Sequence, residues 1–359
     1  MQHAYLSAMD DTGAASPETG WTLRLLCIRK LEKGQAGPLV AAAVLYLKTH
    51  SYGEYVFDWA WADAYQRHGL RYYPKAICAS PFTPVPGTRL LSVDLQSKRA
   101  LISALEQQAQ ENGWSSLHLL FLSQDDLAAC QQAEWLSRHT VQFHWQNQGW
   151  HDFDDFLASL NQDKRKKIRQ ERRKVREAGV VFRAVPGQAA SDADWAFVQQ
   201  CYQQTYWEHG NPPYLQPGFF EAMRRDMPGH WVMFIAERNG HPMAMSLIGL
   251  QRDADGSARV AYGRYWGATQ RVDCLHFEAC YYQPIEWCIA NGVQRFEGGA
   301  QGEHKMARAL LPTPTASAHW IAHPGFAEAI GRFLAREREG VSDYLEVLAQ
   351  HSPLRQPQV

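Results

Sequence analysis

Acidic, basic and imidazole side chains gather in the second half of the chain, at Arg264, Glu297, Glu303, His304 and Lys305. Glutamate and histidine take protons from amines, whereas lysine and arginine stabilise developing negative charge. Transfer of an acyl group to an amine needs both kinds of group. We therefore expect these five residues to be catalytic, although an exposed Glu-His-Lys sequence is also typical of a solvated helix start.

Four consecutive elements would position these side chains. The sequence predicts a strand over 259–266, an aromatic helix over 275–290, a short strand over 294–297 and a glycine-bounded polar cluster over 298–305. Pro284 predicts a kink or irregular turn in the helix near Cys280. The candidate catalytic residues then lie at the ends of two neighbouring strands.

Other polar and aromatic side chains are candidates for substrate contact. In the second half they are Tyr262, Tyr265, Trp266, Glu278 and Gln301. In the first half, the aromatic stretch 50–61 also carries Glu54 and Asp58. It fits either core aromatics with polar groups turned to the surface or a binding wall with stacking platforms, and in the second case Tyr52 and Glu54 would contact substrate.

The segment 161–178 is the most charged part of the chain. Leu160, Ile168 and Val175 form one narrow apolar stripe, which predicts a helix that docks on one side. Its remaining faces are either simply solvated or bind a phosphate-rich ligand, because clustered arginine and lysine contact phosphate oxygens well. The candidate phosphate-binding residues are Lys164, Arg165, Lys167, Arg169 and Arg172.

Composition limits the class of protein. A length of 359 residues predicts about two domains, and 45% apolar residues can fill their cores. The net charge of −1 gives no overall attraction to nucleic acid or anionic membranes, so such binding would need a local patch. Seven scattered cysteines, without a metal-ligand spacing, predict reduced thiols and a cytoplasmic location. No apolar run is long enough for a membrane span, and we see no signal peptide.

The two halves share an order of elements without a literal sequence repeat. Each reads as mixed strands and helices, which predicts α/β domains at 1–150 and 179–359 with a basic helical segment at 151–178. In the second half, Asn239-Gly240 between apolar runs predicts a type I′ hairpin turn, because both residues must adopt positive φ. That hairpin belongs to an antiparallel meander ahead of the long helix.

This order resembles the GNAT acyltransferase fold, and two such units with a basic helix resemble the Fem-type aminoacyltransferases that extend peptidoglycan cross-bridges. The amino-acid sequence is similar to that of a bacterial Fem-like family over essentially its whole length. The matching stretches are Ser51–Tyr55, Gly263–Gly267, His276–Tyr282, Gly292–Gly299 and Gly299–Lys305. The resemblance implies two tandem GNAT-like domains and N-acyl transfer to an amine, such as that of a peptidoglycan precursor.

The resemblance leaves the acyl donor open between aminoacyl-tRNA and acyl-CoA. GNAT enzymes that use acetyl-CoA usually carry a glycine-rich loop between the fourth strand and the next helix, where backbone N–H groups hold the pyrophosphate. The corresponding stretch here, 267–274, lacks that pattern. The departure favours aminoacyl-tRNA or a changed carrier, with tRNA or a lipid-linked precursor contacting the basic helix. An acyl-CoA-dependent enzyme and a non-catalytic precursor- or RNA-binding protein remain the alternatives.

Overall fold

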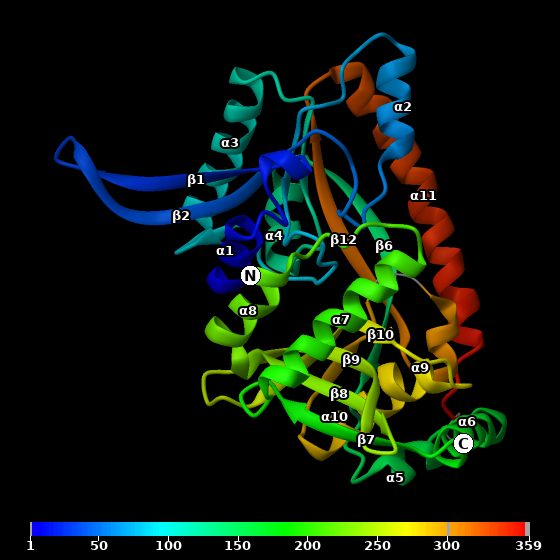
Figure 1. Ribbon diagram of the computed structural model, residues 1–359. Helices are drawn as coiled ribbons and strands as arrows, with labels where there is room; N and C mark the ends of the chain where they lie inside the picture. The colour runs from blue at the N-terminus through cyan, green and yellow to red at the C-terminus, as the bar shows by residue number, and fades with distance from the viewer. Residues whose placement is uncertain (1, 300–301, 356–359) are drawn as a thin grey trace. The chain divides into compact units, whose positions relative to one another are not determined.

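The computed structural model describes residues 2–299 and 302–355 and divides the chain into two compact units (Figure 1). Unit 1 comprises residues 1–141 and 314–344, and unit 2 comprises residues 142–313 and 345–359. The sequence predicts domains at 1–150 and 179–359, with the basic helical segment 151–178 between them. The structure instead assigns 314–344 to unit 1, because β12 (Leu311–Ile321) pairs there with β5 (Ser116–Leu119).

Unit 1 contains a mixed sheet in the order β1-β2-β3-β5-β12, with β4 on β2. β3 and β5 are parallel, and the other neighbours in this sheet are antiparallel. Besides β5 and β12, its elements are α1 (His3–Asp11), η1 (Pro17–Thr19), β1 (Trp21–Glu32), β2 (Gln35–Lys48), α2 (Trp59–Arg67), β3 (Lys75–Cys78), β4 (Leu91–Ser92), α3 (Leu95–Glu111), α4 (Gln124–Gln132), the start of β6 (Leu136–Gln146) and most of α11 (Pro324–Gln350).

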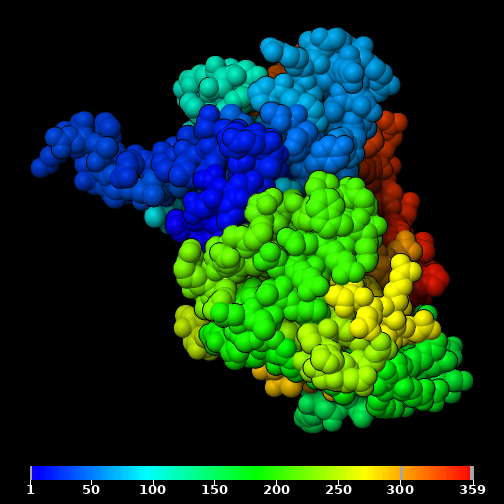
Figure 2. Space-filling model, in the orientation of Figure 1, coloured from blue at the N-terminus to red at the C-terminus, as the bar shows by residue number. Residues whose placement is uncertain are grey.

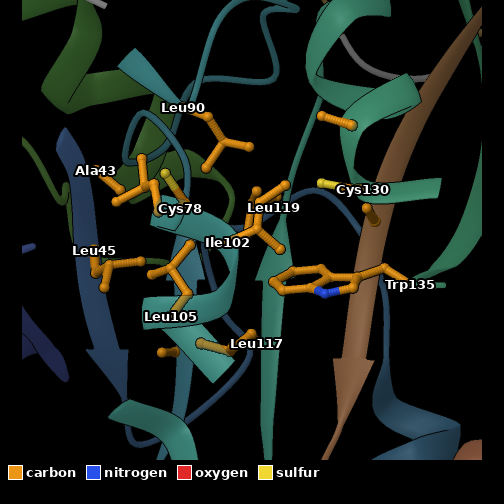
Figure 3. Packing of buried hydrophobic residues seen from close by; sticks show 14 of the residues in the cluster. Ala43, Leu45, Cys78, Leu90, Ile102, Leu105, Leu117, Leu119, Cys130 and Trp135 are labelled. Carbon is orange, nitrogen blue, oxygen red and sulfur yellow. The ribbon is translucent and has the colours of Figure 1, made fainter. Parts of the chain in front are cut away.

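The main core of unit 1 lies between this sheet and α3 and α4 (Figure 3). Leu101 and Leu105 of α3 recur at helical spacing and belong to one buried cluster with Leu117 and Leu119 of β5. The helix begins where the Asp94 side chain accepts a hydrogen bond from the backbone N–H of Ser97 at 2.7 Å. A predicted amphipathic helix thus packs as its periodicity indicates.

A second feature of unit 1 is a buried ionic cluster around Lys75. Its ammonium group donates to Glu54 Oε2 at 2.7 Å, to Ser51 Oγ at 2.9 Å and to Asp58 Oδ2. Lys75 is fully buried and the two carboxylates are nearly so. Buried charges are costly unless paired, so this cluster ties the loop that carries Glu54 and Asp58 to β3.

Unit 2 contains a sheet in the order β6-β11-β10-β9-β8-β7. Only β10 and β11 run parallel among these neighbours. Its elements are the end of β6, α5 (Phe153–Ala158), α6 (Gln162–Glu177), β7 (Val180–Pro186), α7 (Asp192–Glu208), α8 (Pro217–Asp226), η2 (Pro228–His230), β8 (Trp231–Arg238), β9 (His241–Arg252), β10 (Ala258–Ala268), α9 (Leu275–Phe277), the π-helix Glu278–Tyr282, α10 (Gln283–Ala290), β11 (Arg295–Glu297) and η4 (Glu303–Arg308).

The meander of unit 2 has the predicted hairpin. Asn239 and Gly240, between β8 and β9, adopt φ values of 53° and 75°. The expected type I′ geometry is therefore confirmed, since both central residues have positive φ. Among the described residues, no helix is long and apolar enough to cross a membrane.

The long aromatic helix is interrupted as Pro284 predicted. α9 ends at Phe277, a π-helical turn covers Glu278 to Tyr282, and α10 resumes at Gln283. Proline has no backbone N–H to donate, so the regular hydrogen-bond ladder cannot pass through it. Single π-turns inside α-helices are often found at functional sites.

Candidate active site

The expected catalytic residues lie on the parallel pair β10 and β11 or in the segment directly after β11. The paired residues are Val260 with Arg295, Ala261 with Phe296, and Tyr262 with Glu297. β11 then ends, whereas β10 continues to Ala268. The polar segment that begins at Gly298 therefore starts at the carboxyl end of β11, the side on which α/β proteins commonly bind ligands.

Glu297 is a buried carboxylate with one oxygen engaged. The side chain is 2% exposed, and Oε1 accepts a hydrogen bond from Arg295 Nε at 2.9 Å. Oε2 is buried and has no hydrogen-bond partner among the described residues. Burial raises the pKa of Glu297 to about 7, although Arg295 opposes the shift. A carboxylate of this kind can accept a proton near neutral pH.

His144 on β6 lies opposite Glu297 across the β6–β11 pair. Its Nε2 is 3.9 Å from Glu297 Oε2 and 3.0 Å from Gln142 Oε1. Because an amide oxygen only accepts, Nε2 carries the proton and Nδ1 is the unprotonated nitrogen. Nδ1 is buried without a hydrogen-bond partner in the described part of the chain. Burial, together with Arg295 and Lys305, lowers the pKa of His144 to about 3, so the ring is neutral.

Sequence reasoning missed His144 and Gln142. Val141, Phe143 and Trp145 alternate with polar residues along β6, as is typical of a strand. The same alternation places Gln142 and His144 together on the opposite face, and both are buried. Two polar residues on one face of a strand could therefore have marked a site in the sequence. Their partner on β11, however, depends on the strand pairing, which the sequence does not show.

Lys305 is the buried cation of the site. Its side chain is 4% exposed, and Nζ donates to the Gly299 carbonyl at 3.1 Å. Gly298 makes room for it, because a Cβ atom there would lie 3.2 Å from Lys305 Cδ and 2.6 Å from Leu310 Cδ2. Burial lowers the pKa of Lys305 to about 8. The ammonium form therefore predominates at neutral pH but titrates within reach of it.

The neighbouring residues of η4 are more accessible. His304 is exposed, and its Nε2 lies 3.2 Å from Tyr281 OH in the π-helix. Partial burial, with Lys305 and Arg308 nearby, lowers the pKa of His304. Glu303 is exposed at the first position of η4. Gln301 lies outside the described residues.

The candidates on β10 have different environments. Arg264 Nη2 is 3.2 Å from Tyr265 OH, and the guanidinium lies 5.2 Å from the Tyr265 ring centre. Tyr265 is buried and packs against the Tyr202 ring, with the centroids 5.1 Å apart. Tyr262 donates to Gln251 Oε1 at 2.8 Å. Trp266 is half-buried and packs edge-on against His276, so Tyr265 and Trp266 also have packing roles.

Glu278 is engaged by the basic helix. The carboxylate is 3% exposed and accepts hydrogen bonds from Arg172 Nε at 3.1 and 3.3 Å. Arg172 Nη2 also contacts Glu286 Oε2 at 2.6 Å. Two carboxylates therefore compensate this arginine, which the sequence suggests as a phosphate ligand.

A pocket of about 1300 Å³ opens along α6. Arg165, Arg169 and Arg172 line it, whereas Lys164 and Lys167 are not among its lining residues. Its other cations are Lys166, Arg173 and Arg176. The rest of the wall includes Phe153, Leu157, Val180 and Phe182. A cationic pocket with apolar walls suits an anionic ligand that also has flat or apolar groups.

The two candidates in unit 1 differ from each other. Tyr52 is 67% exposed, and its ring packs edge-on with Trp59 at a centroid distance of 5.0 Å. Glu54 is instead buried in the Lys75 cluster. In the described ranges, no group of three or more His, Cys, Asp or Glu side chains is placed to hold a metal ion.

Comparison with solved structures shows the fold. FemX superposes with a TM-score of 0.52 at 11% identity, covering 92% of this chain and 93% of FemX. L-PGS from Bacillus licheniformis superposes with a TM-score of 0.52 at 9% identity, covering 93% of this chain and 97% of the other. The expected α/β class with mixed sheets in two units is confirmed, and FemX shares this fold. No curated protein sequence matches the chain.

The family model provides the second comparison. The FemAB-like model, described as peptidoglycan biosynthesis and recognition, matches residues 1–356. The match covers nearly the whole chain, as the sequence resemblance implied, and together with the fold it points to an acyltransferase. The chain therefore belongs to the FemAB-like family of peptidoglycan biosynthesis and recognition.

Proposed function

We propose that unit 2 transfers an aminoacyl group to an amine, with Glu297 as the general base and Lys305 as the stabiliser of negative charge. The amine nitrogen bonds to the donor carbonyl carbon, and the bond from that carbon to the donor's ribose oxygen breaks. One amine proton passes to Glu297 and is then delivered to the departing oxygen. Lys305 stabilises the oxyanion of the tetrahedral intermediate.

The observation that carries this proposal is the pair of unsatisfied atoms at the end of β11. Glu297 Oε2 and His144 Nδ1 are both buried and both lack a hydrogen-bond partner among the described residues. Buried polar atoms are nearly always paired, so these two open acceptors on the paired strands β11 and β6 favour a ligand that donates hydrogen bonds. An amine is such a ligand.

The surroundings of α9 favour aminoacyl-tRNA over acyl-CoA as donor. The loop before this helix ends at Cys274, whose φ of 66° is an unfavourable conformation for a residue with a side chain. The stretch 267–274 also lacks the glycine pattern whose backbone N–H groups hold the pyrophosphate in GNAT enzymes that use acetyl-CoA, which opposes CoA binding.

The pocket on α6 supports a phosphate-rich donor. Its exposed cations Lys166, Arg169, Arg173 and Arg176 would contact RNA phosphates, whereas Arg172 would hold the pocket wall through Glu278. Family membership favours an amine of a peptidoglycan precursor as acceptor. Donor and acceptor together make this an aminoacyl transfer to a cell-wall precursor.

The test is transfer of radiolabelled amino acid from a mixed aminoacyl-tRNA pool to an amine-bearing peptidoglycan precursor. We expect label in the precursor with wild-type protein, and a loss of at least about 100-fold with Glu297→Gln or Lys305→Met. Lys164→Met, a change on α6 outside the pocket lining, is the matched control and retains transfer.

Two outcomes would contradict the proposal. Transfer from acetyl-CoA but not from aminoacyl-tRNA would make the protein an acyl-CoA-dependent enzyme. Full activity of both site variants, with loss on charge reversal at Arg169 and Arg173, would assign the pocket to binding and remove the catalytic roles of Glu297 and Lys305.

A further inference from the structure

The β1–β2 hairpin is longer than the core beneath it requires. Leu26 and Ile28 of β1 pack against the α3 core, but beyond them every residue from Arg29 to Leu39 is exposed except Gly37, which is partly exposed. Figure 2 shows this end of the hairpin, in dark blue, projecting as an arm from the rest of unit 1. A two-stranded ribbon with both faces in water is only marginally stable.

The arm exposes large apolar side chains. Leu31 is 80% exposed, Leu25 67% and Leu39 47%. β4 continues this surface, because Leu91 pairs with Ala42 of β2 and is itself exposed, as is Val93 just beyond. Neighbouring residues of adjacent strands that pair directly share a face of the sheet. Several exposed leucine and valine side chains together usually mark an interaction site.

The arm is also basic. Residues 21–39 contain Arg24, Arg29, Lys30 and Lys33 against the single acid Glu32, a net charge of four minus one, or +3. The whole chain has a net charge of −1, so positive charge is concentrated here. These four cations form no ion pair with a described residue. Lys30 also helps to lower the pKa of Asp94 near the arm, whereas the charges of Arg24, Arg29 and Lys33 remain for an anionic partner.

We propose that the β1–β2 arm docks on an anionic lipid bilayer. Leu31 and Leu39 enter the interfacial layer while Lys30 and Lys33 contact lipid phosphates, and the long stems of the lysines allow both. A membrane surface has a negatively charged headgroup layer above an apolar interior. The arm carries lysine and arginine for the first and exposed leucine for the second. This docking is independent of the transfer activity proposed for unit 2.

The test is co-flotation of the full-length protein with vesicles of phosphatidylcholine alone or phosphatidylcholine with phosphatidylglycerol. We expect binding to the vesicles with phosphatidylglycerol and a loss on raising the salt concentration. Lys30→Glu with Lys33→Glu, and separately Leu31→Asn with Leu39→Asn, reduce binding at least about tenfold.

The matched controls lie on α2 and in the turn after it. Arg67→Glu with Arg71→Glu changes the net charge by the same amount, and Leu70→Asn removes an exposed leucine. Both retain binding. Circular dichroism melting of the arm variants checks that they remain folded.

Three results would overturn the proposal. The first is no flotation with vesicles that contain phosphatidylglycerol, and the second is equal flotation of the arm and control variants. The third is a concentration-dependent dimer, seen by light scattering, that is lost in the Leu31→Asn with Leu39→Asn variant. The last would assign the arm to a second copy of the chain through the exposed edge strand β1.

Discussion

Arg308 and Glu171 form a buried ion pair that ties η4, the segment carrying Lys305, to the basic helix α6. Arg308 Nη2 lies 3.1 and 3.0 Å from the two carboxylate oxygens of Glu171. Arg308 also donates to Tyr282 OH at 3.2 Å and to the His304 carbonyl at 3.0 Å. One guanidinium thus holds α6, the π-helix and the residue before Lys305 together.

Glu171→Gln is expected to destabilise the protein strongly. Removing one partner of a buried pair leaves the other charge uncompensated, which typically costs about 3–5 kcal/mol. Urea denaturation followed by circular dichroism measures the loss. Glu177→Gln, at an exposed position on the same helix, changes the free energy of unfolding by less than about 0.5 kcal/mol. Equal effects of the two substitutions would contradict a structural role for the pair.

Gly267→Ala is expected to destabilise unit 2 through overpacking. A Cβ atom at Gly267 would lie 2.2 Å from the Cys201 carbonyl oxygen of α7, so the helix would have to shift away from β10. Such overpacking costs about 1–3 kcal/mol or more. Gly340→Ala on α11 meets no atom within 4 Å and is expected to stabilise the helix by roughly 0.5–1 kcal/mol. Thermal melts compare the two variants. An unchanged melting temperature of Gly267→Ala would show that α7 and β10 are not in close contact at this position.

Stability should depend on pH through Glu297. The pKa of Glu297 is raised by burial from 4.5 to about 7, so the folded protein binds an extra proton between these values. The stabilisation by this proton is present below pH 4.5 and is lost as the pH rises through 7. Glu297→Gln should therefore gain stability relative to wild type between pH 5 and pH 8, by at most about 3 kcal/mol. A difference in melting temperature that stays constant across this range would contradict the raised pKa.

Transfer activity should have a bell-shaped pH profile. Glu297 must be ionised to accept a proton, and its pKa of about 7 predicts a rise in kcat/KM through that pH. Lys305 must be protonated to stabilise the oxyanion, and its pKa of about 8 predicts a fall above it. Lys305→Arg should remove the falling limb, because arginine stays charged. A profile that only rises would instead make neutral Lys305 the base.

The sequence by itself determined the local elements and part of the site. The Asn239-Gly240 turn, the amphipathic helix α6 and the break near Pro284 follow from residues a few positions apart, so their patterns predict them directly. The placement of Glu297 at the end of β11, and of Lys305 in the segment after it, follows from the same local pattern.

Only the tertiary structure decided which distant residues meet. His144 joins Glu297 because β6 pairs with β11, and Arg308 compensates Glu171 because η4 packs against α6. Residues 314–344 join unit 1 through strand pairing, although they follow unit 2 in the chain. Sheet register and burial depend on the whole fold rather than on neighbours in sequence. Burial also decides whether a carboxylate such as Glu54 or Glu278 is open to solvent or paired with a cation.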